Sequence, residues 1–239
     1  MNRLLDYFIA FLITLFLLQS TMTHAEPLST SEPAKLTGAW NGMRTSLLNQ
    51  GIRINAFYTG EVISNVNGGI RQQSTYLDIV EMMITSNFDE IAPWKGTTFY
   101  INAMGTHGKN PGDSVGDLQG ISNIAAPNMI KIHEIWLQQN YQNDRFSILF
   151  GLYDLNSEFD VLETGGQFLN SSHGMGADYA QSGKNGPSTF PLTSLSLRLK
   201  AQLTESISVQ SAILDGAPDE SDNFLNTTSH LNSQDGALI

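Results

Sequence analysis

Side chains that could carry out catalysis are few in this chain of 239 residues. There is no cysteine, so thiolate chemistry and disulfide bonds are both excluded. Glu158 and Asp160 lie close together in a long polar segment, and a pair of carboxylates can act as general acid and general base. No recognisable catalytic setting surrounds them, and sequence spacing does not set the distance between two loop carboxylates. We therefore predict that the protein is not an enzyme.

Metal ligands are not indicated either. His107, His133 and His173 lie on different segments and lack the spacing of metal-binding histidines. Asp113 and Asp117 each follow a glycine, but they lack an EF-hand pattern and offer too few oxygen donors for a divalent cation. We predict no bound metal and no other cofactor.

The remaining candidates are charged and amide side chains on segments with a strict alternation. Over residues 194–204, every second residue is leucine or alanine, and the residues between them are polar and include Arg198 and Lys200. Successive side chains of a strand point to opposite faces. The segment therefore predicts a strand with one apolar face and one polar, partly cationic face, which is typical of a strand with lipid on one side and water on the other.

The positions and connections of the other alternating segments favour a barrel. Strands are predicted at 52–62, 75–88, 97–107, 128–141, 146–153, 193–204 and 207–214, with an eighth beginning at 236–239. The connections between them are alternately long and short, as in bacterial outer-membrane barrels with long extracellular loops and short periplasmic turns. A short amphipathic helix is predicted over 37–50, with Thr37 as its cap and Gly51 as its stop. The predicted fold class is all-β, an antiparallel transmembrane β-barrel.

The N-terminus has the form of an export signal. Arg3 precedes an apolar run over 7–18, and a small-residue cleavage site ends at Ala25. The run is short for a membrane-spanning helix, and a retained anchor is the alternative interpretation. We predict a signal peptide at 1–25, a polar leader and helix at 26–51, part of a barrel at 52–239, and a location in a Gram-negative outer membrane.

Charge and strand number narrow the prediction further. The formal net charge is −11, which disfavours nucleic acid as a partner. Seven or eight strands are too few for an open aqueous barrel, which needs roughly sixteen to eighteen. The chain also ends inside a hydrophobic run without a closing aromatic strand. We therefore expect the N-terminal part of a longer protein.

An ordered set of short motifs resembles the carbohydrate-selective porins of the OprB type. The chain departs from the family's usual pattern at Ala39, where an acidic residue is common, and at Asn41, where glycine is common. The motifs cover most of the chain after residue 35, and they are Leu36-Thr37-Gly38-Ala39-Trp40-Asn41-Gly42-Met43-Arg44 with Gly51-Ile52, Gly68-Gly69, Gly116-Asp117-Leu118-Gln119 with Ser122-Asn123, Glu134-Ile135-Trp136-Leu137, Ser157-Glu158-Phe159, Phe168-Leu169-Asn170-Ser171-Ser172 and Asp215-Gly216.

The resemblance implies a sixteen-stranded channel that passes mono- or oligosaccharides by facilitated diffusion. Outer-membrane lipid would surround the barrel. A homotrimer is one possible assembly of the full-length protein. Sugars are neutral and rich in hydroxyls, so their passage needs several weak polar contacts. The pore-lining candidates are Arg53, Glu61, Glu134, Trp136, Gln138, Glu158, Arg198 and Lys200.

Several alternatives stay open at the level of sequence. The candidate charges can simply pair across the lumen and solvate it, and the acidic loop that holds Glu158 can fold inward or outward. The whole chain could also be a secreted or periplasmic β-sandwich that binds carbohydrate, or a glycoside hydrolase that uses Glu158 and Asp160. We favour the barrel because only lipid tolerates leucines on the outer face of strands whose other face carries Arg198 and Lys200.

Overall fold

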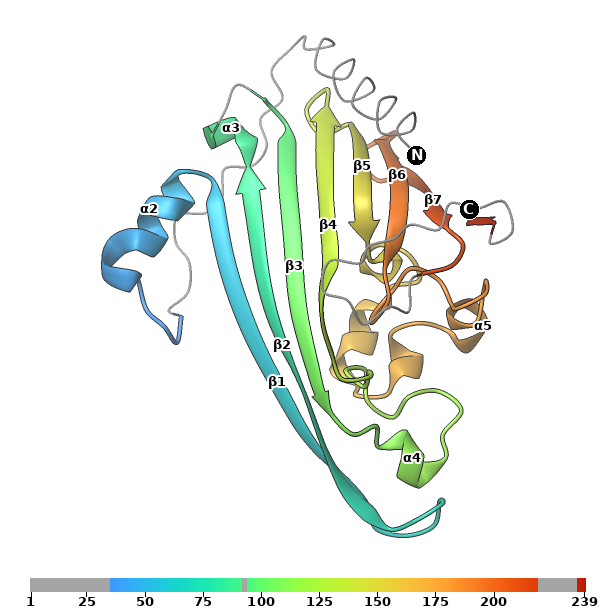
Figure 1. Cartoon of the computed structure of the whole chain (residues 1–239). Coiled ribbons are helices and arrows are strands. Elements are labelled where there is room, and N and C mark those ends of the chain that lie inside the picture. The colour runs from blue at the N-terminus through green and yellow to red at the C-terminus, as the bar shows by residue number, and fades with distance from the viewer. Residues whose placement is uncertain (1–34, 92–93, 219–235) are drawn as a thin grey trace, which may run out of the picture.

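The computed structural model describes residues 35–91, 94–218 and 236–239, and the predicted signal peptide lies outside them. A single antiparallel sheet of eight strands, ordered β1 to β8 as in the sequence, forms the framework of the described chain (Figure 1). The strands are β1 (Ile52–Asn65), β2 (Gln73–Asn87), β3 (Thr97–Gly108), β4 (Met129–Tyr141), β5 (Phe146–Tyr153), β6 (Ser194–Gln202), β7 (Ser208–Asp215) and β8 (Ala237–Leu238).

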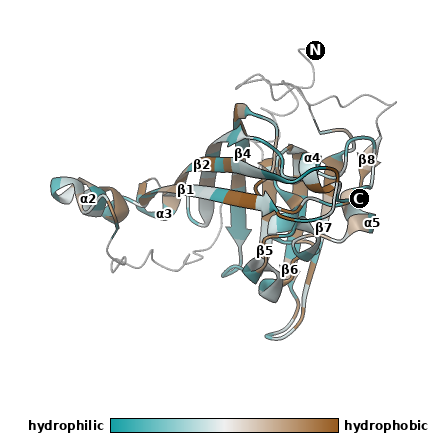
Figure 2. Ribbon diagram, turned by 90° about the horizontal axis from the view of Figure 1, so that it is seen from below, coloured by the Kyte–Doolittle hydropathy of each residue, from teal (hydrophilic) through white to brown (hydrophobic). Residues whose placement is uncertain are grey.

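The helices are short and lie outside the sheet. Among the described residues, none is long and apolar enough to cross a bilayer. α2 stands at one side of the sheet, away from α4 and α5 (Figure 2). The α-helices are α2 (Met43–Asn49), α3 (Phe88–Ile91), α4 (Gly112–Val115) and α5 (Ala177–Ala180), and the 3-10 helices are η1 (Trp40–Gly42), η2 (Leu155–Ser157), η3 (Glu163–Gln167) and η4 (Ser171–His173).

The N-terminal helix begins later than its sequence pattern predicts. Asn41 has a left-handed φ of 55°, so the backbone breaks between η1 and α2, and α2 starts after Gly42 without a side-chain cap. The Thr37 cap is therefore wrong, because the Thr37 hydroxyl instead accepts a hydrogen bond from Arg44 Nη2 at 2.8 Å. Gly51 does follow the helix end with φ of 76°, a conformation that glycine adopts without strain.

The first hairpin is longer than predicted. Asn65 pairs with Gln73, and the hydroxyls of Ser64 and Ser74 lie 2.8 Å apart on neighbouring strands. These residues are polar on both faces of the strands, so hydrophobic alternation does not mark the end of the pairing. The other predicted strands are confirmed within a few residues.

The strand register separates two opposite faces of the sheet. One row across six strands is entirely apolar, and the adjacent row is polar or aromatic over most of its length. We call these sides the apolar face and the polar face. The apolar row is Ile54, Ile84, Ile101, Ile135, Leu152 and Leu195, and the adjacent row is Arg53, Thr85, Tyr100, Trp136, Gly151 and Ser196.

Exposure is inverted relative to a water-soluble protein. Leu199 is 49% exposed and Ile213 is 50% exposed, whereas Arg198, on the opposite face of β6, is only 3% exposed. Large apolar side chains that are bare on one side of a sheet mark a surface meant for another apolar phase. The β-sandwich alternative would need a second sheet over this face, but all eight described strands belong to one sheet.

The connections after β3 alternate in length as the sequence predicted, but the first two do not, because residues 66–72 after β1 are fewer than residues 88–96 after β2. The β4–β5 turn is short, with left-handed φ values at Gln142, Asn143 and Asp144. Long connections follow β3 and β5, and they lie together at the opposite end of the sheet with α4, α5, η2, η3 and η4 (Figure 1). From β3 onward, short turns and long loops therefore occupy opposite ends of the strands.

Substitution of Ile84 by Lys tests the assignment of the two faces. We expect Ile84→Lys to destabilise the membrane-inserted protein by roughly 2–4 kcal/mol if this row lies near the bilayer midplane, because the ammonium would meet hydrocarbon. Thr85→Lys is the matched control, since its side chain lies on the polar face of the same strand. Denaturant unfolding and heat-modifiable gel migration of the full-length protein measure the difference. Equal effects of the two variants would contradict the assignment.

Candidate functional site

Arg198 of β6 is the centre of a polar group on the polar face. Its Nη1 donates to Ser147 Oγ of β5 at 2.6 Å, and its Nη2 donates to Gln138 Oε1 of β4 at 2.7 Å. Its Nε lies 2.7 Å from Glu158 Oε2, as an ion pair rather than a well-directed hydrogen bond. A guanidinium offers several donors in a fixed plane, so one side chain joins three strands and a loop.

Glu158 brings the long loop between β5 and β6 to this group. The Tyr153 hydroxyl donates to Glu158 Oε2 at 2.6 Å, and Lys200 Nζ lies 3.6 Å from Glu158 Oε1. The backbone carbonyl of Glu158 also accepts a hydrogen bond from Gln210 Nε2 of β7 at 2.8 Å. The start of the loop is therefore held against the polar face, which answers the question of its direction that the sequence left open.

Apolar packing supports the same loop segment. Leu155 in η2 is 1% exposed and belongs to a buried cluster with Leu149 and Tyr153 of β5 and Ala212 and Leu214 of β7. Asp154 caps η2 by accepting from the Asn156 backbone N–H at 2.9 Å. The start of the loop is thus fixed by the burial of Leu155 as well as by the Glu158 contacts.

The end of the same loop packs on this cluster through Tyr179 in α5. Burial of the Tyr179 hydroxyl raises its pKa, and the nearby Asp160 carboxylate raises the pKa further. The raised pKa keeps the phenol neutral over a wider pH range, and a neutral phenol suits a side chain that packs against apolar neighbours.

A second polar group surrounds the bulge in β4. The register shifts between Asn102 and Ala103, so that β4 carries His133 as an extra residue. His133 Nε2 lies 3.2 Å from Asp154 Oδ2, and the Asp154 backbone N–H donates to Glu134 Oε1 at 3.2 Å. His133 is therefore not the isolated strand residue that its sequence context indicated, because the bulge turns it toward the start of the loop.

Trp136 lies between the second polar group and the apolar cluster that contains Leu155. Its ring stacks on Tyr100 of β3 with centroids 4.8 Å apart and an interplanar angle of 27°, and its Nε1 donates to Glu134 Oε1 at 3.2 Å. The ring also packs against the cluster that contains Leu155. Much of the Trp136 surface is therefore in contact with protein. Less of the ring is free to stack on a solute, which is the role predicted for it.

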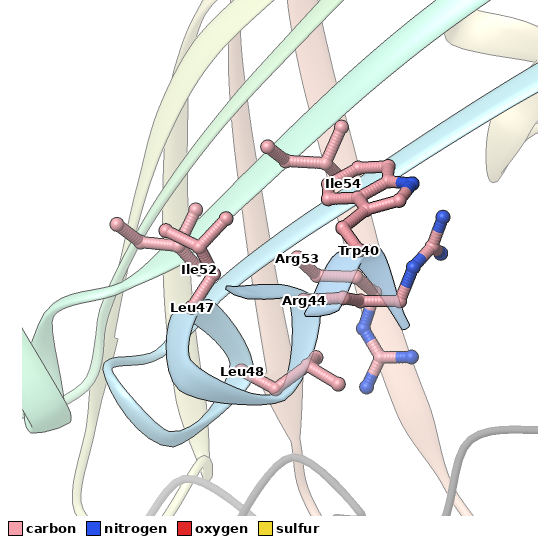
Figure 3. A pocket seen from close by; sticks show the side chains of 7 residues that line it. All are labelled: Trp40, Arg44, Leu47, Leu48, Ile52, Arg53 and Ile54. Carbon is pink, nitrogen blue, oxygen red and sulfur yellow. The ribbon is translucent and has the colours of Figure 1, made fainter. Parts of the chain in front are cut away.

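Two candidates on β1 lie apart from the Arg198 group, since four strands separate β1 from β6. Arg53 lines a small pocket between α2 and the start of β1, together with Trp40, Arg44, Leu47, Leu48, Ile52 and Ile54 (Figure 3). The Arg44 guanidinium lies over the Trp40 ring at 4.2 Å from its centroid. Glu61 has one buried carboxylate oxygen, Oε2, without a hydrogen-bond partner among the described residues.

Sequence reasoning did not select several members of the site. Ser147, Tyr153 and Gln210 contact Arg198 or Glu158, but they are neutral and were not chosen as candidates. The alternation of side chains along β5 and β7 places all three on the polar face. The sequence therefore contained a pattern that could have identified them. In the described part of the chain, no three histidine or acidic side chains are grouped as metal ligands.

The sheet and the site together define a class of protein. The sheet has an exposed apolar face and a polar face that carries buried ions, and a loop folds onto the polar face. These features are those of the wall of an outer-membrane β-barrel channel. The family model of the carbohydrate-selective porins, OprB family, matches residues 71–239. The chain belongs to this family, which implies a channel rather than an enzyme.

Individual relatives agree with the family. Porin B of Pseudomonas aeruginosa is 28% identical over 134 residues, which are 52% of this chain and 30% of that protein. The putative porin QuiX of Acinetobacter baylyi is 23% identical over 160 residues, which are 62% of this chain and 36% of that protein. This chain thus spans about a third of the length of these curated relatives.

Two solved structures share the fold. The high-pH structure of Pseudomonas putida OprB has a TM-score of 0.71 and 21% identity, and the match covers 84% of this chain and 50% of that one. The low-pH structure of the same protein has a TM-score of 0.52 and also 21% identity, with 77% of this chain and 51% of that one covered. The predicted family and the predicted antiparallel barrel architecture are confirmed.

Removal of Arg198 should release the start of the long loop. Arg198→Ala leaves the Glu158 carboxylate without its closest cation, and the loss of one partner of a buried pair typically costs roughly 3–5 kcal/mol. We expect faster proteolytic cleavage of the loop in the membrane-inserted full-length protein. Lys200→Ala is the control, because Lys200 is 40% exposed and its longer contact should contribute less than about 1 kcal/mol. Equal protection of the loop in wild type and Arg198→Ala would contradict this role of the ion pair.

Proposed function

We propose that this chain forms part of the wall and the constriction of a sugar-selective outer-membrane channel. Mono- or oligosaccharides would pass by facilitated diffusion through a barrel of sixteen strands. The observation that carries the proposal is the Glu158–Arg198 contact, which holds a long loop against the polar face of the sheet. An inward loop reduces the free cross-section of a wide barrel to a size at which side chains can contact a small solute.

The charges of the site suit a neutral solute. Arg198 and Glu158 largely neutralise each other, while Lys200 and Gln138 add polar groups on the same face. Such groups can replace the hydrogen bonds that a sugar makes with water, without binding an ion tightly. Among the other candidates, Glu134 and Trp136 support the wall beside this group, and Arg53 and Glu61 would line a separate part of the lumen.

The topology supports an orientation in the membrane. The short turns would lie in the periplasm and the long loops, including the one with Glu158, would lie outside the cell. Residues 1–25 would be the export signal that delivers the protein to the outer membrane, with 26–51 as leader and helix and 52–239 as barrel wall. A homotrimer is part of this proposal, and the native mass of the full-length protein in detergent measures it.

Sugar flux through the reconstituted full-length protein tests the proposed function. We expect wild-type protein to support swelling of liposomes in isosmotic sugar, and Arg198→Ala with Lys200→Ala to raise conductance and reduce discrimination by solute size, because the loop loses both cations that hold it. The double variant should retain heat-modifiable migration. The control is Thr98→Ala, a polar-face change on β3 that leaves the loop contacts intact.

Absence of sugar-dependent swelling in wild-type liposomes would refute the channel. Unchanged conductance and unchanged size discrimination in the double variant would show instead that the cations do not control the constriction.

A further inference from the structure

A pair of stacked rings stands exposed on the long loop, apart from the Arg198 group. The rings of Phe168 and His173 have centroids 4.4 Å apart at an interplanar angle of 30°. Phe168 is 54% exposed, although a phenyl ring normally avoids water. The neighbouring η3 and η4 lie in the gold segment of the chain at the loop end of the sheet (Figure 1).

The backbone around the rings is fixed by hydrogen bonds. The Phe168 N–H donates to the Gly165 carbonyl at 3.0 Å, and the Leu169 carbonyl accepts from the Asn123 N–H at 2.7 Å. The Ser171 N–H donates to the Gly120 carbonyl at 2.9 Å. The long loop is therefore joined to the loop after β3 at two positions just after Phe168, and a bond within the long loop fixes the backbone of Phe168 itself.

Close packing around Gly165 adds to this rigidity. A side chain at Gly165 would clash with the carbonyl oxygen of His173, so only glycine lets η3 approach η4 this closely. The approach brings the two ring-bearing segments together. An aromatic side chain on such a preorganised support loses little conformational entropy when it contacts a ligand.

The loop segment that carries the rings has no charged residue and is rich in hydrogen-bonding groups, while the acidic residues Asp160, Glu163 and Asp178 flank it. Residues 164–177 contain no Asp, Glu, Lys or Arg. Asn170 Oδ1 accepts from the Ser172 N–H at 2.9 Å, which orients the side chain and directs its carbonyl oxygen to the backbone. The Asn170 amide nitrogen donates no hydrogen bond within the described residues, so it can donate to a ligand.

We propose that Phe168, Asn170 and His173 form a stacking subsite for a pyranose ring at the outer mouth of the channel. The apolar C–H face of the sugar lies on the Phe168 ring, and its hydroxyls accept hydrogen bonds from the Asn170 amide and exchange them with the His173 imidazole. An anionic ligand finds no Lys or Arg in residues 160–178, and a purely apolar ligand leaves the amide without a partner. The inference rests on the proposed function, because it names a binding step before the constriction.

The experiment compares Phe168→Leu with Leu169→Ala in the full-length protein reconstituted in liposomes. Leu169 is the matched control, because it is the next residue and is similarly exposed at 58%. D-glucose is the probe with a rigid C–H face, and the acyclic polyol mannitol is the neutral probe without one. We expect Phe168→Leu to raise the half-saturating concentration for glucose flux roughly 3- to 10-fold, with mannitol flux unchanged.

A second variant separates recognition from folding of the loop. Asn170→Asp keeps the oxygen that accepts from Ser172 but removes the free amide donor. It should weaken glucose flux at low concentration while heat-modifiable migration stays as in wild type. The subsite would be overturned if Phe168→Leu and Leu169→Ala changed glucose flux equally. It would also be overturned if Phe168→Leu reduced glucose and mannitol flux to the same extent.

Direct binding distinguishes failure of the subsite from failure of the channel. Saturation-transfer NMR of glucose on the detergent-solubilised protein reports contact with the ring without any flux. If wild-type protein binds glucose in a Phe168-dependent way but passes no sugar, the subsite stands and the proposed function falls. If wild-type protein passes glucose and Phe168→Leu changes neither binding nor flux, the subsite falls and the proposed function stands.

Discussion

The contrast between lipid on one face of the sheet and water on the other is the constraint on which the structure depends. In hydrocarbon, each backbone polar group needs a partner, and an antiparallel sheet supplies these partners between strands. The alternation of side chains then gives each strand an apolar face and a polar face at no additional cost in backbone hydrogen bonding. The apolar row from Ile54 to Leu195 and the adjacent row from Arg53 to Ser196 are the result of this constraint.

The polar face is not simply wet, because a loop occupies part of it. A barrel wall that carries Arg198 needs either water or a counterion for the guanidinium, and Glu158 supplies the counterion from outside the sheet. Leu155 adds apolar burial next to the ion pair, so the loop is attached by two different forces. This combination makes the direction of the loop depend on the wall as well as on the loop sequence.

Much of the fold could be predicted from the sequence, because alternation, turn residues and loop lengths are local properties. The predicted strand over 194–204 shows this best, since the observed exposures follow the alternation from Ser194 to Lys200. Prediction was weaker where polar residues fill both faces, as at Asn65 and Gln73, and where a backbone break at Asn41 moved the start of a helix. The bulge at His133 could not be predicted, because it depends on how β4 is paired with β3.

By itself, the sequence determined the two faces of each strand, the order of the strands, and the family, because these depend on residue types at short spacing. It also selected Arg198, Lys200 and Glu158 as candidates. Only the tertiary structure decided that these three meet, and that Tyr153 and Gln210 complete the contact with Glu158. The physical reason is that β5, β6 and β7 become neighbours through backbone pairing, while the loop returns to them through side-chain charge and apolar burial. Those forces act between residues far apart in the chain, and no local pattern records them.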